Sequence, residues 1–425
     1  MVVAALWAGA LGCSSSSSSG PSTHDGGADG SRDAGKRRDS GRVDSGRVDS
    51  RADSRPLGQP DASPDVLDGG CALSSTCHAC LATDPANCGT CGNSCGAGGS
   101  CSGGFCARVL ATGQAASPNV VEDIVIDDDS VYWIPATGGA SGGRVVSVPK
   151  AGGTITTLAS GVALPEGLAQ DSSYVYFVSH NVGVERVAKT GGPSTQLLQD
   201  GVSGVDPDDF PEFWLLVASP DLYYVGGQGT GVYEMPIGGG DPTPLTTSAG
   251  LLGAPGTGYY AVAVDDAGVY YDTVSQIVIV DRAANLQIGV VPGSSPTAGD
   301  RFGPTLAIDD ASIYFISNVL SDAGIASSLM KVAKGADGGA PALITSDSVG
   351  FDDGPIVVDD TSVYWSHTTG ASGLDGVVLS VPKGGGSVVT VATGCAAQCP
   401  FAVDATTIYW PTSDGKIRSD RKQPL

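Results

Sequence analysis

Acidic side chains and two histidines recur between the short aliphatic runs of this chain, and their chemistry suits cation binding or proton transfer. Ca²⁺ takes several carboxylate and carbonyl oxygens at loose geometry, while histidine serves as an acid–base group or a metal ligand. The pattern predicts a cation site with Ca²⁺ as the candidate ion, and an ordinary solvated acidic surface is the alternative. The candidates are Glu122, Asp123, Glu166, His180, Asp208, Asp209, Glu212, Asp300, Asp352, Asp353 and His367.

These residues are not accompanied by a complete catalytic motif. The sequence contains neither the H-E-x-x-H zinc motif nor a phosphate-binding P-loop. Paired carboxylates catalyse glycosidic chemistry, but the spacing here fixes no pair at the required separation. Binding is therefore favoured over catalysis.

Seven copies of a three-residue motif indicate the elements that position the candidates. Each copy is an aliphatic residue, a tyrosine and a second aromatic residue, and successive tyrosines are 44 to 50 residues apart. This period, filled with short strands and Gly-rich turns, is typical of a β-propeller blade. We expect the tyrosines to be buried wedges between blades, each worth roughly 1.5–3 kcal/mol. The copies are Val131-Tyr132-Trp133, Val175-Tyr176-Phe177, Leu222-Tyr223-Tyr224, Val269-Tyr270-Tyr271, Ile313-Tyr314-Phe315, Val363-Tyr364-Trp365 and Ile408-Tyr409-Trp410.

The fullest repeat predicts four strands, over 123–126, from Val131 onward, over 144–149 and over 154–158. An Asp-rich turn joins the first two, because short Asp side chains bond the turn backbone. The expected fold class is all-β, a seven-bladed propeller of four-stranded antiparallel blades over residues 107–425.

The last repeat lacks a fourth strand, and a matching segment precedes the first repeat. Residues 107–113 resemble the fourth-strand segments at 157–161 and 391–394. We expect 107–113 to form the outer strand of the final blade. That arrangement closes the ring and removes two open sheet edges.

The predicted fold places the candidate residues on one rim. Loops that enter the innermost strands share a face with the loops between second and third strands. The entry loops carry the carboxylates, with Asp206 and Arg301, and the other loops carry both histidines, Asp375 and Asp414. The predicted cation site therefore lies at the mouth of the central channel.

The seven Tyr-aromatic pairs, and the Asp before each, resemble the YWTD and NHL families of propellers and, more loosely, seven-bladed lyase-type propellers. The resemblance covers 107–425, although the copies continue as Ile134-Pro135, Ser366-His367 and Pro411-Thr412 rather than Thr-Asp. It implies the fold. It implies no single activity, because propellers host many.

The N-terminus predicts export. Residues 2–11 form an apolar run too short to span a membrane, and Ala10-Leu11-Gly12-Cys13 resembles a bacterial lipobox in which Cys13 is lipidated. Residues 1–13 are then the signal segment, and the Ser-, Gly-, Asp- and Arg-rich residues 14–70 a disordered linker. We expect an outer-membrane or cell-surface lipoprotein held only by its lipid; a periplasmic or secreted protein is the alternative.

Ten further cysteines agree with export, since even clusters in exported chains form disulfides. Eight lie in a small Cys-rich module at 71–106, whose CxxC…CxxC spacing leaves zinc as an alternative. The remaining two are expected to pair with each other. The ten are Cys71, Cys77, Cys80, Cys88, Cys91, Cys95, Cys101, Cys106, Cys395 and Cys399.

The formal net charge of −23, from 45 acidic and 22 basic residues, excludes nucleic acid as a partner. Two functions remain. The first is a monomeric, surface-anchored binding protein whose loop face contacts a protein or glycan. The second is an exported lyase or hydrolase with a cation-assisted site at the channel mouth.

Overall fold

The computed structural model describes 66–67, 71–72, 76, 83–88, 91–92, 94–95, 99–102, 105–113, 121–135, 142–179, 182–199, 215–218, 220–225, 232–245, 259–273, 276–282, 284, 286–292, 306–321, 324–335, 340–347, 355–368, 376–395 and 399–422. Ser63–Leu425 form one compact unit, whereas Met1–Ala62 fall outside the described residues. The sequence-based boundaries at 13/14 and 70/71 therefore stay predictions.

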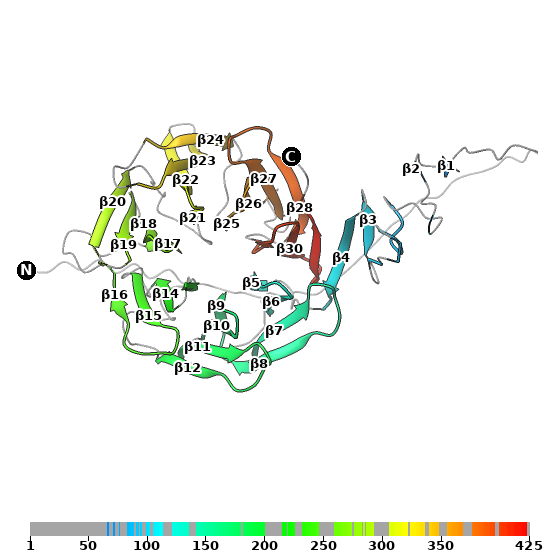
Figure 1. The fold of residues 1–425 in the computed structure, drawn as a ribbon, viewed down its shortest axis with the longest axis horizontal. Helices are drawn as coiled ribbons and strands as arrows, with labels where there is room; N and C mark the ends of the chain where they lie inside the picture. The colour runs from blue at the N-terminus through cyan, green and yellow to red at the C-terminus, as the bar shows by residue number, and fades with distance from the viewer. Residues whose placement is uncertain are drawn as a thin grey trace, which may run out of the picture. The chain divides into compact units, whose positions relative to one another are not determined.

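The described part of Ser63–Leu425 is a seven-bladed β-propeller, as the repeat period predicted (Figure 1). Each blade is an antiparallel meander whose first strand is innermost. The first three blades are β5 (Val121–Ile126), β6 (Ser130–Pro135), β7 (Gly143–Pro149) and β8 (Thr156–Val162); β9 (Pro165–Gln170), β10 (Tyr174–Ser179), β11 (Gly183–Ala188) and β12 (Thr195–Gln199); β13 (Leu215–Ala218), β14 (Asp221–Val225), β15 (Val232–Pro236) and β16 (Thr243–Pro244).

The next three blades repeat the same order. They are β17 (Tyr259–Val264), β18 (Gly268–Thr273), β19 (Gln276–Asp281) and β20 (Leu286–Pro292); β21 (Leu306–Ile308), β22 (Ser312–Ser321), β23 (Gly324–Ala333) and β24 (Ala342–Asp347); β25 (Ile356–Val358), β26 (Ser362–Thr368), β27 (Gly376–Pro382) and β28 (Val389–Cys395). A separate two-stranded ladder joins β1 (Val66–Leu67) to β2 (Cys71–Ala72).

The seventh blade is closed by the N-terminal side of the propeller, as predicted. Its own strands are β29 (Ala402–Val403), β30 (Thr407–Pro411) and β31 (Ile417–Arg421), and its outer strand is β4 (Phe105–Ala111). The register pairs Ile417 with Ala111 and Arg418 with Val109. A fifth strand, β3 (Ser100–Ser102), pairs with β4, so the ladder continues across the predicted boundary at 106/107 into the Cys-rich segment.

The disulfides hold this region and the last blade. Cys88 bonds to Cys101 in β3, and Cys395 bonds to Cys399 as predicted. Cys91 and Cys95 are also oxidised, so Cys88-x-x-Cys91 cannot supply thiolates to zinc. Cys77 and Cys80, and the side chains of Cys71 and Cys106, lie outside the described residues.

Seven apolar clusters fill the seven seams between blades, and period-2 alternation in the second strand decides which residue enters which seam. In the seam between the first two blades, Tyr132 of β6 packs with Leu168, Val175 and Phe177 of the second blade. The neighbours of Tyr132 in sequence point the other way. The central tyrosines are thus inter-blade wedges, as predicted, and each is at most 4% exposed.

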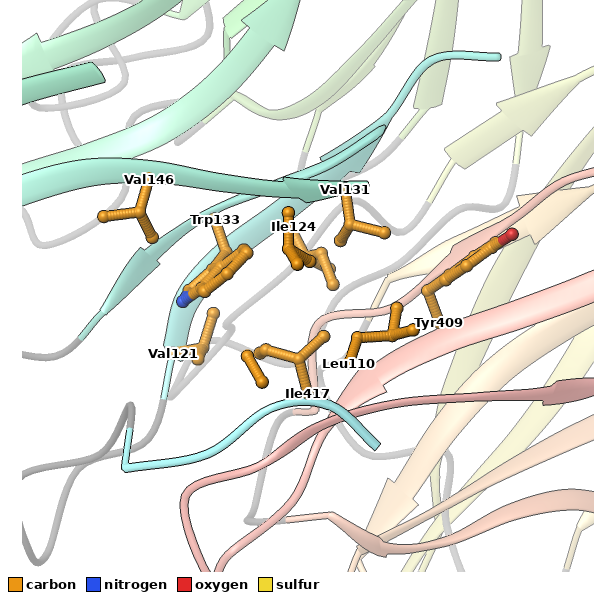
Figure 2. Packing of buried hydrophobic residues seen from close by; sticks show 10 residues of the cluster. Leu110, Val121, Ile124, Val131, Trp133, Val146, Tyr409 and Ile417 are labelled. Carbon is orange, nitrogen blue, oxygen red and sulfur yellow. The ribbon is translucent and has the colours of Figure 1, made fainter. Parts of the chain in front are cut away.

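The seam between the seventh and first blades shows how closure works (Figure 2). Tyr409 and Ile417 of the seventh blade meet Val131 and Trp133 of the first, and Leu110 of β4 completes the same cluster. The closing strand therefore contributes both a ladder of backbone hydrogen bonds and a buried side chain.

Prediction: deleting residues 107–113 should lower the melting temperature sharply, because it opens the final ladder and exposes the Leu110 cluster. Leu110→Ala should destabilise by about 2–5 kcal/mol, the usual range for a buried leucine. Thermal and urea unfolding of the full-length protein measure both, with the exposed residue Val388 changed to Ala as the control. An unchanged melt of the deletion variant would refute closure by β4.

Candidate functional site

The residues predicted to form the cation site are mostly not placed by the structure. His180, Asp208, Asp209, Glu212, Asp300, Asp352 and Asp353, together with Asp206, Arg301 and Asp375, lie outside the described residues, as does the side chain of Glu122. Across the part of the chain that is described, no three or more His, Cys, Asp or Glu side chains are arranged to hold a metal ion. The calcium site therefore stays a prediction.

Three of the predicted residues have described side chains. Asp123 accepts hydrogen bonds from the amides of Ile124 (2.7 Å) and Leu168 (2.6 Å), so it links the first blade to the second. Glu166 lies in β9, half-buried opposite Val178. His367 was expected in a loop, and that placement is wrong: it lies in β26 opposite Val377, only 6% exposed, because β26 runs on past the aromatic motif.

Asp414 was expected beside the histidines. It is exposed at a turn of the seventh blade and accepts hydrogen bonds from Thr412 Oγ1 and Lys416 Nζ. No described contact joins it to His367.

The strongest polar arrangement is one that the sequence alone did not indicate: an ionic clasp across the seams. In six blades an aspartate directly follows the first strand, five residues before the central tyrosine. Its Oδ1 accepts two backbone N–H groups of the turn at 2.7–3.0 Å. The tyrosine hydroxyl donates to the same carboxylate. The six aspartates are Asp127, Asp171, Asp265, Asp309, Asp359 and Asp404.

At five seams a lysine from the following blade completes the clasp. Lys383 is typical: its Nζ is 2.6 Å from Asp309 Oδ2 and 5.8 Å from the centre of the Tyr314 ring. Its backbone N–H donates to Thr361 O of its own blade, which fixes where the side chain starts. The five pairs are Lys150–Asp404, Lys189–Asp127, Lys334–Asp265, Lys383–Asp309 and Lys422–Asp359.

The clasps lower the pKa of their carboxyl groups. Burial works to raise the pKa of Asp127, but Lys189, the Tyr132 hydroxyl and two turn amides outweigh it and hold the pKa at about 2. Asp359 and Asp404 have a pKa of about 2 for the same reasons. The tyrosines shift upward: burial, together with Asp309, raises the pKa of Tyr314 to about 12.

The third blade departs from this pattern on both sides. Ala218 stands where the aspartate is expected, and Arg282 of the fourth blade reaches the Ala218 carbonyl (2.8 Å) and Asp221 (3.2 Å) instead. On the other side, Ile237 stands at the lysine position and faces the second blade.

The two faces of the ring differ in regularity. On the clasp face, the connections from first to second strand are three residues long in six blades and two in the third. On the other face, the stretches from a fourth strand to the next first strand range from 2 residues (163–164) to 15 (200–214). Most of the acidic candidates belong to these longer stretches. The clasp face also holds a hollow of about 580 Å³ over the seventh, first and second blades, lined by five carboxylates and two lysines.

Comparison with known proteins supports the fold alone. No family model matches this chain, and no curated protein is similar to it in sequence. The extracellular domain of the putative hybrid two component system BT4673 from B. thetaiotaomicron superposes with a TM-score of 0.50 at 13% identity, covering 75% of this chain and 40% of that one. YCF48 from Cyanidioschyzon merolae gives 0.49 at 10% identity (74% and 98%), and BamB from Moraxella catarrhalis 0.43 at 13% (74% and 98%).

Prediction: Asp309→Ala should destabilise the protein by about 2–4 kcal/mol, since it leaves Lys383 and the Tyr314 hydroxyl half-buried without their acceptor and removes two turn bonds. The matched control is Asp310→Ala, the exposed next residue of the same turn, which should change the free energy of unfolding by less than about 0.5 kcal/mol. Equal effects of the two substitutions in urea unfolding would refute the clasp.

Prediction: the melting temperature should fall as the pH drops from about 4 to about 2. Asp127, Asp359 and Asp404 have folded-state pKa values of about 2, below the ordinary 3.8, so their stabilisation is complete above the ordinary value and is lost as the pH falls through the folded value. Circular dichroism melts across this range measure the loss. A flat profile, or one that falls only below pH 2, would contradict it.

Proposed function

We propose that this protein is an extracytoplasmic binding protein that contacts a protein or glycan partner with the face opposite the clasps. The observation that carries the proposal is the contrast between faces. The first-to-second-strand turns of the clasp face are short and nearly uniform and hold the aspartates of the inter-blade ion pairs, whereas the connections from fourth to first strands on the other face are of unequal length. Recognition surfaces are built on such variable connections supported by a rigid scaffold.

Two solved propeller structures are complexes with a partner, which is consistent with this proposal but is no argument for it. YCF48 has been captured with a D1 peptide and nidogen with laminin, but their TM-scores to this chain are only 0.47 and 0.39. The charge of this chain adds a restriction: a face rich in carboxylates attracts cations, repels phosphates and does not exclude neutral polar ligands.

Export and anchoring belong to the same proposal. The oxidised cysteines of the Cys-rich segment and the Cys395–Cys399 bond fit an oxidising compartment. None of the described segments forms a helix that would reach across a lipid bilayer. Cys13 would carry the lipid and residues 14–70 would tether the propeller to the membrane; fractionation of a Cys13→Ser variant tests this, because loss of the anchor releases the protein.

The alternative, an exported lyase or hydrolase, is favoured by no geometry among the described residues. The predicted catalytic contributors that are described, Asp123, Glu166 and His367, lie in strands of three different blades.

Prediction: a thermal-shift screen of the full-length protein against CaCl₂, glycans and peptidoglycan fragments should give at least one stabilising ligand without turnover. Asp208→Asn with Asp209→Asn should weaken that response, because both residues belong to the longest connection of the loop face. The matched control is Asp128→Asn with Asp129→Asn, two exposed acids of a clasp-face turn, which should leave it unchanged. If the response is lost only in the Asp128→Asn, Asp129→Asn variant, the partner binds the clasp face and the proposal is contradicted.

A further inference from the structure

The seam between the second and third blades holds a clasp that lacks its lysine. Asp171 keeps the rest of the arrangement: the amides of Ser173 and Tyr174 bind its Oδ1, each at 2.7 Å, and the Tyr176 hydroxyl donates to its Oδ2 at 2.7 Å. The cation position is Ile237. Among the described residues, no lysine or arginine nitrogen forms an ion pair with Asp171.

The backbone at Ile237 still follows the clasp pattern. Its N–H donates to Pro220 O at 3.1 Å, as Lys383 N donates to Thr361 O at 2.9 Å in the sixth blade. The register agrees, because Ile237 follows Pro236, the partner of Asp221, just as Lys383 follows Pro382, the partner of Ser362. Ile237 therefore differs from the clasp lysines only in its side chain, and this seam lacks only the ammonium group of a clasp.

A hollow of about 570 Å³ opens at this position. We call it the notch; its lining is Gln170, Asp171, Ser172, Ser173, Tyr174, Tyr176, Arg186, Val217 and Ile237. Its lining includes the carboxylate of Asp171 and the apolar side chains of Val217 and Ile237. An ammonium group on a short alkyl stem has matching chemistry, with the charge for Asp171 and the stem for the apolar wall.

Arg186 also lines the notch, and its charge raises the question of whether it replaces the lysine. Its guanidinium stacks 4.4 Å from the centre of the Tyr174 ring, and its Nη1 donates to Ile237 O at 2.8 Å. In the fifth blade Lys331 makes the same bond, 2.8 Å to Lys383 O, while Lys383 still reaches Asp309. One cation position thus contacts a backbone carbonyl and the other pairs with the aspartate. Arg186 occupies the first position, so it does not replace the lysine.

We propose that the notch binds a primary alkylammonium group, such as the side chain of a partner's lysine or a small amine, which takes the place that lysines occupy at the five clasped seams. The chain itself supplies the precedent, because five equivalent carboxylates each hold a lysine ammonium beside the equivalent tyrosine ring. The notch lies on the clasp face, so this inference stands independently of the proposed loop-face function.

The test uses n-butylammonium chloride on the full-length protein, with NaCl at equal ionic strength and 1-butanol as controls. A single ammonium site should have a Kd on the order of 1 mM, and the melting temperature should rise with butylammonium and not with either control. Nα-acetyl-lysine amide and cadaverine, compared in the same titration, separate a protein lysine from a small diamine as the natural source.

Two substitutions make the result specific. Ile237→Lys should install the missing clasp, raise the melting temperature and abolish the butylammonium response. Lys383→Ala should lower the melting temperature and create a second notch, so that butylammonium restores part of the loss. If Ile237→Lys does not fold, Asp171→Asn, which keeps the turn-binding oxygen but removes the charge, should abolish the wild-type response instead.

A wild-type response no larger than that to NaCl would overturn the proposal. The result would be clearest if butylammonium raised the melting temperature of Lys383→Ala in the same experiment. A clasp without its lysine would then bind the amine, whereas the notch would not. A response that persists unchanged in Ile237→Lys would place the amine elsewhere and overturn the proposal equally.

Discussion

This structure depends on filling the seam between adjacent blades, and one tyrosine per blade contributes to each seam in two ways. Its ring fills the apolar space that two twisted sheets leave between them, and its hydroxyl reaches the edge of that space. A buried hydroxyl needs a partner. In six blades the aspartate that follows the first strand accepts its hydrogen bond, and in the third blade Glu234 accepts that of Tyr223. The same aspartate fixes the turn and holds the lysine of the next blade, so packing, turn geometry and inter-blade charge are coupled through a single carboxylate.

The architecture could be predicted because its signals are local or strictly periodic. Blade number follows from the tyrosine period, and closure follows from the missing last strand and its counterpart at 107–113. The clasp could not, since its partners are far apart in sequence: Lys150 and Asp404 are separated by 254 residues and meet only once the ring has closed. The sequence contains both partners of the clasp, an Asp-rich turn and a lysine after the third strand, but neither one indicates that it pairs with the other. His367 was misplaced for a smaller reason, the variable length of the second strand.

The same coupling explains why the two faces of the ring diverge. The first-to-second-strand turns on the clasp face must place an aspartate and receive a lysine, and their length is nearly constant. The connections on the opposite face carry no such requirement among the described contacts, and their lengths vary severalfold. Connections of unequal length on a rigid scaffold are what a recognition surface needs.

The third blade is where the coupling is weakest, and its two departures are adjacent rather than scattered. It supplies neither the aspartate to the fourth blade nor the lysine to the second, so the lysine clasps run without interruption from the fourth blade through the seventh and first to the second. Its seams rest instead on Arg282 with Asp221 on one side and on the packing of Tyr176 with Leu222 and Tyr224 on the other. A ring tolerates one such place because its remaining seams hold the ends of the gap at a fixed distance. Asp171, which forms no ion pair among the described residues, is thus kept in a preformed shape, and preformed shape is what makes a missing internal contact available to an external group.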